Sequence, residues 1–325
     1  MAYSNNVVRR ARQRLESQKA DYESVQQAHL QEIYEKLPRV REIDRQLRSS
    51  MVLAAQAAFL KGTDGADALA QVRQANLALQ AERKELIAHN FPADYLEDGP
   101  ICTHCNGTGY VGSAMCSCLL KLCRQEQKKE LSLLSAGEQS FDQFCLKYYP
   151  EKIDPKYGAS PRTIMTRILD ICRKYAANFS ADAGNLLFTG STGLGKTFLS
   201  ACIAQEVANK GYSVAYASAQ QLFAKLEKNR FHPDEESGQE ADKYTNCDLL
   251  IIDDLGTELT GNFTVAALYT LVNERLLANK PMIISTNLNI TEIHQRYSPQ
   301  IASRLQGCFQ LLPFVGEDIR ILKNK

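Results

Sequence analysis

A strand, a glycine-rich turn and a helix follow one another between residues 185 and 211, and they constrain the fold of this 325-residue chain more than any other feature. The apolar stretch NLLFT leads into GSTGLGKT (190–197), and the helical stretch TFLSACIAQEVANK follows until Gly211 ends it. A buried strand before the turn and a helix after it are the context in which the pattern G-x-x-x-x-G-K-[ST] is meaningful. We therefore expect a phosphate-binding loop; the alternative is an incidental glycine turn.

Each part of this loop has an expected task. The glycines let backbone N–H groups curl around phosphates at a helix N-terminus, where the helix dipole favours anions. Lys196 adds a positive charge beside the outer phosphates of ATP, and the hydroxyl of Thr197 is expected to hold Mg²⁺. The predicted nucleotide-binding residues of the loop are Gly190, Ser191, Thr192, Gly193, Leu194, Gly195, Lys196 and Thr197.

Two acids end a second apolar strand, in CDLLIIDDLG (247–256). A carboxylate at the C-terminal end of a parallel strand lies beside the phosphate loop, where Mg²⁺ needs an oxygen partner. We therefore assign Asp253 to the metal and expect Asp254 to polarise the attacking water. The alternative is an exposed acidic turn.

Two further polar residues follow later strands. The strand MIIST ends at Asn287, whose amide can orient water or sense the terminal phosphate. The stretch SPQIASRLQG (298–307) predicts a short helix with Ser298 as its cap, which presents Arg304. Taken alone, Asn287 is a weak signal and Arg304 would be a solvated surface arginine.

From about residue 160 onward, apolar strands alternate with amphipathic helices. The strands are expected in NLLFTG, YSVAYAS, DLLIIDD, PMIISTN and CFQLLPF. This alternation predicts an α/β fold with a parallel sheet and crossover helices on both faces.

The order GSTGLGKT, LLIIDD, STN, SRL resembles the AAA+ ATPases and, within them, the DnaC and DnaI helicase loaders and the IstB transposition helpers. The resemblance covers about residues 139–325 and includes SFDQFCLKYYP, which is similar to the segment that these proteins place near the adenine. It implies Walker A roles for Lys196 and Thr197, Walker B roles for Asp253 and Asp254, and a sensor 1 role for Asn287.

The resemblance also implies that Arg304 is an arginine finger acting on ATP of a neighbouring subunit, so that the ATP-bound protein is a homo-oligomer. Many relatives have Glu where this chain has Asp254, which suggests slower or more tightly gated hydrolysis. Arg304 lies near the end of the sequence, so we expect no helical lid with a second sensor; whether Arg320, in GEDIR, partly substitutes for that sensor is left open.

The segment from about Tyr3 to Asn90 is rich in Gln, Ala, Glu, Arg and Leu, and it is expected to be helical. Pro38 and the loop KGTDGAD (61–67) divide it into three helices, as an antiparallel hairpin or bundle or as a partner-binding coiled coil. The expected domains are a helical region (1–98), a zinc knuckle (99–124), a linker with the adenine-side segment (125–160) and the ATPase domain (161–325).

Four cysteines cluster between residues 102 and 118, separated by glycines that allow tight turns. We expect Cys102, Cys105, Cys116 and Cys118 to hold Zn²⁺ as a closed structural site, because so small a unit gains much of its folding energy from metal ligation. A redox pair or an iron–sulfur cluster is the alternative, and His104 and Cys123 are nearby spare ligands. The resemblance to the zinc-containing N-terminal region of DnaI-type loaders implies that this part holds the replicative helicase.

The net charge of +1 gives no global basic field, so any contact with DNA must be local. The sequence shows no secretory signal and no stretch long enough to span a bilayer, and we expect a cytoplasmic protein. Lys225, Lys228 and Arg230 are candidate DNA contacts or a solvated charged face, and the polar stretch 232–242 is expected to be a mobile loop.

The leading functional hypothesis is an ATP-dependent loader that places a DnaB-type replicative helicase on single-stranded DNA. The alternatives are an IstB-like helper that recruits a transposase to duplex DNA, and a non-hydrolysing adaptor switched by ATP binding alone.

Overall fold

The computed structural model describes residues 3–58, 63–97, 99–134, 139–232 and 235–323. Contacts within the chain divide it into two compact units. One comprises Met1–Gln13 together with Ser117–Lys325, and the other comprises Arg14–Cys116.

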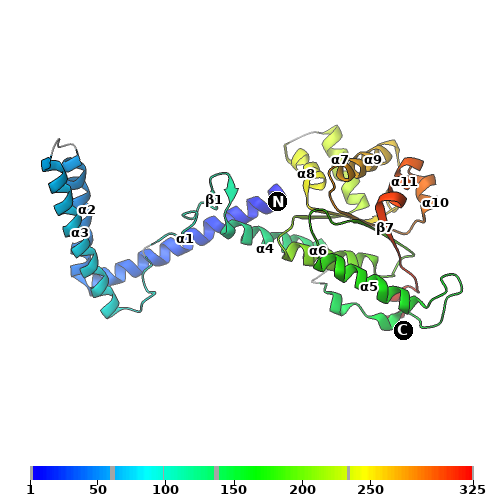
Figure 1. Cartoon of the computed structure of the whole chain (residues 1–325), viewed down its shortest axis with the longest axis horizontal. Coiled ribbons are helices and arrows are strands. Elements are labelled where there is room, and N and C mark those ends of the chain that lie inside the picture. Colours follow the sequence, from blue (N-terminus) through cyan, green and yellow to red (C-terminus); the bar gives the residue numbers. More distant parts are fainter. Residues whose placement is uncertain (1–2, 59–62, 98, 135–138, 233–234, 324–325) are drawn as a thin grey trace. The chain divides into compact units, whose positions relative to one another are not determined.

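A five-stranded parallel sheet forms the centre of the larger unit (Figure 1). The strand order is β4-β5-β6-β3-β7, and all four neighbouring pairs are parallel. The strands are β3 (Asn185–Thr189), β4 (Val214–Ser218), β5 (Leu249–Leu255), β6 (Met282–Thr286) and β7 (Phe309–Pro313). These are the five strands expected from the sequence, so the prediction of a parallel-sheet α/β domain is confirmed.

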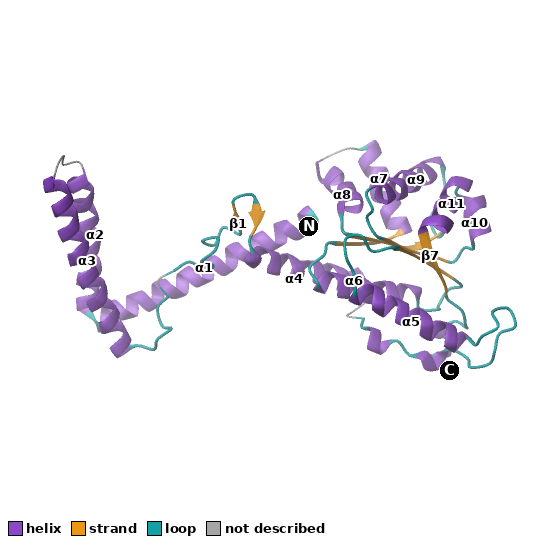
Figure 2. Ribbon diagram, viewed as in Figure 1, coloured by secondary structure: helices purple, strands orange, loops and turns teal. Residues whose placement is uncertain are grey.

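Helices cover both faces of this sheet (Figure 2). Helices α5 (Pro161–Ala177) and α6 (Lys196–Asn209) pack on the face to which Leu186 and Phe188 of β3 contribute. Leu187 points to the opposite face, into the core shared by α7 (Ala219–Phe231), α9 (Asn262–Leu277), α10 (Ile290–Arg296) and α11 (Pro299–Cys308). Alternate side chains of one strand thus enter two cores, which is why the strands read as continuous apolar runs.

Helix α4 (Ser117–Leu134) is the expected charged connecting helix, and it covers the edge of the sheet at β4. The side chain of Gln127 donates to the carbonyl of Tyr212 at 2.9 Å and accepts from the backbone N–H of Val214 at 3.1 Å. A side chain of α4 therefore pairs with two backbone groups at the start of this edge strand.

The chain after β7 turns back toward the glycine-rich loop. Among the residues that the structure describes, this part holds one helix, α12 (Ile319–Leu322). Short as it is, α12 is held in place, because the backbone N–H of Ile319 donates to the carbonyl of Gly193 at 3.0 Å.

The N-terminal part of the chain forms three long helices, as expected. They are α1 (Asn5–Lys36), α2 (Pro38–Ala58) and α3 (Thr63–Asn90), of which α2 and α3 form an antiparallel hairpin (Figure 1). Pro38 sits at the first position of α2, where its missing N–H costs no helical hydrogen bond. Ile33, Val40 and Phe91 are buried at the base of the hairpin.

The first turns of α1 belong to the larger unit. Val7 and Ala11 are buried there, and the hydroxyl of Tyr3 donates to the carbonyl of Gly211 at 2.9 Å. Farther along α1, Val25 is 49% exposed.

Three local expectations are wrong. The stretch 232–242 was expected to be a mobile loop, but α8 (Glu235–Asn246) is a helix, and it packs on α7 and α9 through the buried Tyr244. Tertiary burial outweighs the polar composition of its first turns. Helix α3 begins inside the stretch expected to be a loop, and α11 continues through Gly307. None of the described helices has the length and apolar character needed to cross a membrane.

Candidate nucleotide-binding site

The glycine-rich loop connects the end of β3 to the start of α6, as its sequence predicts. Gly190, Gly193 and Gly195 all have positive φ angles, of 136°, 75° and 85°. A Cβ atom at Gly190 would lie 2.3 Å from the carbonyl oxygen of Phe314, and one at Gly193 would lie 1.9 Å from Oδ1 of Asp318. Glycine is therefore required at both positions by conformation and by space.

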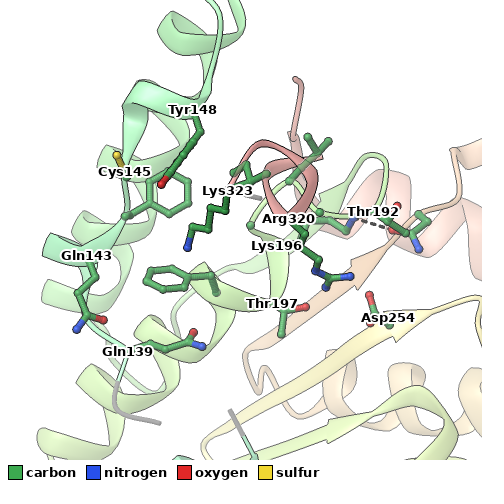
Figure 3. A pocket seen from close by; sticks show the side chains of 17 residues that line it. Gln139, Gln143, Cys145, Tyr148, Thr192, Lys196, Thr197, Asp254, Arg320 and Lys323 are labelled. Carbon is green, nitrogen blue, oxygen red and sulfur yellow. Dashed lines mark hydrogen bonds between the residues drawn. The ribbon is translucent and has the colours of Figure 1, made fainter. Parts of the chain in front are cut away.

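A cavity of about 310 Å³ opens over this loop (Figure 3). Lys196, Thr197 and Asp254 lie at one end of it, and Gln143, Tyr148 and other residues of the segment 139–148 lie at the other. The loop end is polar and charged, whereas the opposite end has aromatic rings. Such a cavity matches the two halves of a nucleotide, a phosphate chain and a planar base.

The segment 139–148 contains two short 3-10 helices, η1 (Phe141–Gln143) and η2 (Leu146–Tyr148). The buried hydroxyl of Tyr149 donates to the carbonyl of Leu194 at 2.9 Å, which ties the segment to the glycine-rich loop. Phe144 packs against Phe198 with ring centroids 5.8 Å apart. The structure therefore brings the segment expected near the adenine to the same cavity as the loop.

Lys196 is only 4% exposed, and its ammonium group donates to three oxygens. These are the carbonyls of Gly190 at 2.6 Å and Ser191 at 2.7 Å, and Oδ1 of Asn287 at 2.7 Å. Burial lowers the pKa of Lys196 from its ordinary value, and the nearby Asp254 and Asp253 act in the opposite direction. All three acceptors are neutral, so the positive charge is left to attract an anion such as a phosphate.

Asp253 is 6% exposed and lies on β5 next to Thr197 of α6. The hydroxyl of Thr197 is 3.3 Å from Oδ1 of Asp253. A hydroxyl and a carboxylate that face one another beside a phosphate loop are the oxygen ligands that suit Mg²⁺, so these residues fit the expected metal. The carboxylate also accepts hydrogen bonds from the hydroxyls of Ser285 and Tyr216, which the sequence analysis did not single out.

Asp254 has an unusual backbone. Its φ of 54° is positive, and the pairing of β5 with β6 shifts register between Ile252 and Leu255. The backbone N–H of Asp254 donates to the hydroxyl of Ser285 at 2.9 Å. The bulge re-aims the second acid into the cavity while the first remains in the strand, and a non-glycine residue held in this conformation often marks a functional site. Burial and the neighbouring Asp253 raise the pKa of Asp254 above the ordinary range of an aspartate.

Asn287, expected as a sensor, follows β6 and reaches Lys196, so the structure brings it together with the loop and both acids. Arg304 lies elsewhere, against α9 of its own chain. Its guanidinium group donates to Oδ1 of Asn273 at 3.1 and 3.0 Å and to the hydroxyl of Tyr269 at 2.9 Å, and it stacks on the Tyr269 ring at 4.5 Å. Arg304 is thus not among the residues that line the cavity.

Several cavity residues were given no individual role by the sequence analysis. Arg320 of α12 and Lys323, which follows it, line the cavity, and Figure 3 shows both reaching toward it. Cys145 lies near the aromatic end. The signal for Arg320 and Lys323 was their basic character after the last strand, but only the return of the chain to Gly193 brings them to the site.

The four clustered cysteines come together as expected. Each of Cys102, Cys105, Cys116 and Cys118 offers a sulfur, and all four sulfurs lie within 4.8 Å of one another. The hairpin of β1 (Tyr110–Val111) and β2 (Ala114–Met115) lies between the two pairs, and the backbone N–H of Gly109 donates to the sulfur of Cys105 at 3.2 Å.

The spacing of these sulfurs fits a metal. Cys102 and Cys116 have sulfurs 3.8 Å apart. Four sulfurs placed about 2.3 Å from one Zn²⁺ at the corners of a tetrahedron would lie about 3.8 Å from each other, whereas a disulfide would need about 2 Å. Among the described residues, none of these four cysteines is part of a disulfide.

Comparison with known proteins assigns this site to a family. Residues 162–305 match the model of the family described as IstB-like ATP binding protein. The replicative helicase loader DnaC of Escherichia coli (strain K12) is 23% identical over 138 residues, which cover 42% of this chain and 56% of that protein. The loader DnaI of Bacillus subtilis (strain 168) is 25% identical over 183 residues, 56% of each protein.

Other similarities point to mobile elements and to solved folds. A protein described as ATP-binding in an insertion sequence of Mycobacterium tuberculosis (strain ATCC 25618 / H37Rv) is 30% identical over 116 residues, 35% of this chain and 45% of that protein. A crystal structure of the DnaC helicase loader has a TM-score of 0.46 at 20% identity, covering 54% of this chain and 95% of that one. The chain spans about half the length of the curated relatives that it matches. Residues 162–305, the part of the chain that holds this site, thus match the IstB-like ATP-binding family of P-loop proteins, and the chain is similar over this part to the DnaC and DnaI helicase loaders.

Proposed function

We propose that this protein is an ATP-dependent loader that places a DnaB-type replicative helicase on single-stranded DNA. The observation that carries the proposal is the cavity that joins Lys196, Thr197, Asp254 and Asn287 to an aromatic end suited to a base. Similarity to DnaC and DnaI supports the loading role over other uses of such an ATPase.

The proposed chemistry follows from the positions of the side chains. Backbone N–H groups of residues 190–195 and the ammonium group of Lys196 bind the phosphates, while Thr197 and Asp253 hold Mg²⁺, which neutralises charge on the outer phosphates when bound. Asp254 orients and polarises the attacking water. The amide oxygen of Asn287 accepts a hydrogen bond from the ammonium group of Lys196. Hydrolysis then resets the protein after the helicase has been delivered.

Arg304 completes the site of a neighbouring subunit in this proposal. The charge that develops on the transferred phosphate needs a cation, and fingers of this kind act from another protomer in many ATPases. Two observations support the role: Arg304 is absent from the cavity of its own chain, and Tyr269 and Asn273 hold its guanidinium group in one orientation on α11. Full activity then requires an ATP-bound homo-oligomer.

The cysteine cluster would hold a structural Zn²⁺ through its four thiolates, with no ligand position left open for catalysis. We propose that this knuckle (99–124) and the helical region (1–98) form the adaptor that docks on the helicase. The linker and adenine-side segment (125–160) would connect this adaptor to the ATPase domain (161–325).

A local surface on α7 supports contact with single-stranded DNA. The helix carries Lys225, Lys228 and Arg230, and Phe231 next to them is 59% exposed. The ring of Phe231 lies 5.9 Å from that of Phe263, and the guanidinium group of Arg230 lies over the Phe263 ring at 5.8 Å. Basic groups that track the backbone, together with aromatic rings on which bases stack, are the usual means of binding single strands.

A second candidate function is that of an IstB-like helper that recruits a transposase to duplex DNA. The family match over residues 162–305 and the insertion-sequence relative favour it. The two functions share the ATP site and differ in the partner and in the form of DNA.

One experiment separates them. The full-length protein is mixed with a DnaB-type hexamer and single-stranded DNA, and helicase occupancy of the DNA is measured with and without ATP. A loader raises occupancy in an ATP-dependent way, and Lys196→Ala removes the ATP dependence. Binding to duplex DNA without contact to the helicase would favour the transposition helper, and ATP-dependent loading without any turnover would favour the non-hydrolysing adaptor.

A further inference from the structure

Tyr216 makes a buried contact with the first acid of the site, although no motif marks it. It lies on β4, which pairs directly with β5, and it is 8% exposed. Its hydroxyl donates to Oδ2 of Asp253 at 2.8 Å. A tyrosine phenol keeps its proton at neutral pH, so the hydroxyl of Tyr216 is a donor to this carboxylate.

Ser285 makes the matching contact from the opposite side. It lies on β6, the other neighbour of β5, and it is fully buried. Its hydroxyl donates to Oδ1 of Asp253 and accepts the backbone N–H of Asp254 at 2.9 Å. The Asp253 carboxylate therefore accepts a hydrogen bond from one hydroxyl on each flanking strand.

These two bonds determine the plane of the carboxylate. Each carboxylate oxygen accepts about two hydrogen bonds or metal contacts, so one donor on each oxygen fixes the group without filling it. Thr197 contributes only a long contact of 3.3 Å to Oδ1, which leaves its own hydroxyl available to a metal ion. Preorganised orientation matters because a ligand that must be ordered on binding loses affinity.

We propose that Tyr216 and Ser285 are positioning residues that hold the Asp253 carboxylate in the orientation needed for the metal of a bound Mg–nucleotide. This inference rests on the proposed nucleotide site and adds two side chains to it. Tyr216 does not touch the nucleotide; it acts through Asp253. The competing interpretation is that Tyr216 only fills the core around β4 and β5, and its ring would serve that purpose without the hydroxyl.

The test compares nucleotide affinity with and without the metal, using the full-length Tyr216→Phe protein. ATP affinity is measured by calorimetry in excess Mg²⁺ and again in EDTA. We expect Tyr216→Phe to reduce the gain in affinity that Mg²⁺ provides by about tenfold, the typical effect of a hydrogen bond to a charged group, and to leave the affinity in EDTA unchanged. Ser285→Ala is expected to act in the same direction.

Tyr175→Phe is the control, because it removes the same atom from another, partly buried tyrosine, whose hydroxyl donates to the carbonyl of Gly184 at 2.9 Å. It should leave both affinities unchanged. In an Asp253→Asn background, Tyr216→Phe should have almost no further effect on the Mg²⁺ gain.

Four outcomes count against the inference. An unchanged Mg²⁺ gain in Tyr216→Phe and Ser285→Ala overturns it, and so does an equal loss of affinity with and without the metal, which indicates a packing role. If the unaltered protein binds ATP in EDTA but gains nothing from Mg²⁺, the positioning role fails while the phosphate loop stands. If the unaltered protein binds no nucleotide at all, the proposed function fails as well.

Discussion

At the scale of single residues, the site depends on two adjacent acids that the backbone treats differently. Asp253 stays in the strand, and hydroxyl groups on both sides bind it. Asp254, the next residue of β5, lies at a bulge with a positive φ of 54° and lines the cavity. Two identical side chains one position apart thus obtain separate tasks from local geometry.

The raised pKa of Asp254 leads to a pH prediction. If its carboxylate orients the attacking water, turnover falls when the pH drops through a pKa above the ordinary aspartate range, and Asp254→Asn lowers turnover strongly at every pH. The folded protein binds this proton more tightly than the unfolded chain does, so the residue makes the free energy of unfolding decrease as pH rises through the same range. A pH–rate profile of ATP hydrolysis is measured for the unaltered protein and for Asp254→Asn, with ATP affinity as the control. An Asp254→Asn protein with full turnover contradicts the assignment.

At the scale of elements, the glycine-rich loop is shaped by what packs against it. The consensus pattern requires Gly190 and Gly195, but Gly193 is a free position in that pattern. Here Gly193 is constrained because Asp318, which caps α12, leaves no room for a Cβ atom. The helix that carries Arg320 is thereby locked onto the loop.

A substitution at this contact is therefore expected to be costly. Gly193→Ala forces an alanine into a left-handed conformation and against Asp318, which should destabilise the protein by about 1–2 kcal/mol or more and weaken ATP binding. Gly261→Ala is the control, because φ is −128° there and a Cβ atom would meet nothing within 4 Å. Thermal unfolding and ATP titration of both variants test the claim, and equal behaviour would show that α12 does not constrain the loop.

The cysteine element has its own test. Cys102→Ser with Cys105→Ser should abolish about one bound zinc per chain and loosen the segment around residues 102–118, because two ligands cannot close a tetrahedral site. Cys308→Ser removes an exposed cysteine outside the cluster and should leave the metal content unchanged. Elemental analysis of the purified proteins measures the difference; the same zinc content in the double variant would exclude this site.

At the scale of the whole molecule, the position of Arg304 leads us to expect different effects on ATP binding and on ATP hydrolysis. Its guanidinium group is held on α9 and not in the cavity of its own chain. If Arg304 is the proposed finger, it acts on the nucleotide of another copy, and the active form is then an assembly.

Arg304→Ala should accordingly leave ATP affinity nearly unchanged while lowering turnover by about a thousandfold. Arg167→Ala, at an exposed position on α5, is the matched control and should change neither quantity. ATP binding and steady-state hydrolysis are measured at several protein concentrations, because turnover of the unaltered protein should rise with assembly. Equal loss of binding and turnover in Arg304→Ala would mean that the residue does not act in trans.

The sequence by itself determined the five strands, their parallel arrangement and the residues of the phosphate loop. Long apolar runs that alternate with helices, together with a loop whose glycines are required by geometry, leave few other folds open. The same local signals identified Asp253, Asp254 and the four cysteines. The two acids are adjacent in the sequence and the four cysteines lie between residues 102 and 118, so the members of each group are close together along the chain.

Only the tertiary structure decided which distant side chains complete these sites. Tyr216 lies 37 residues before Asp253 and Ser285 lies 32 residues after it, and both reach it because the sheet order puts their strands on either side of β5. Arg320 lies on the last helix and reaches the cavity because the chain turns back after β7. Helix α8 formed in a polar stretch for a similar reason, since burial of Tyr244 against α7 and α9 outweighs local composition. Contacts between residues far apart in sequence have no local signature, so strand order and packing alone could reveal them.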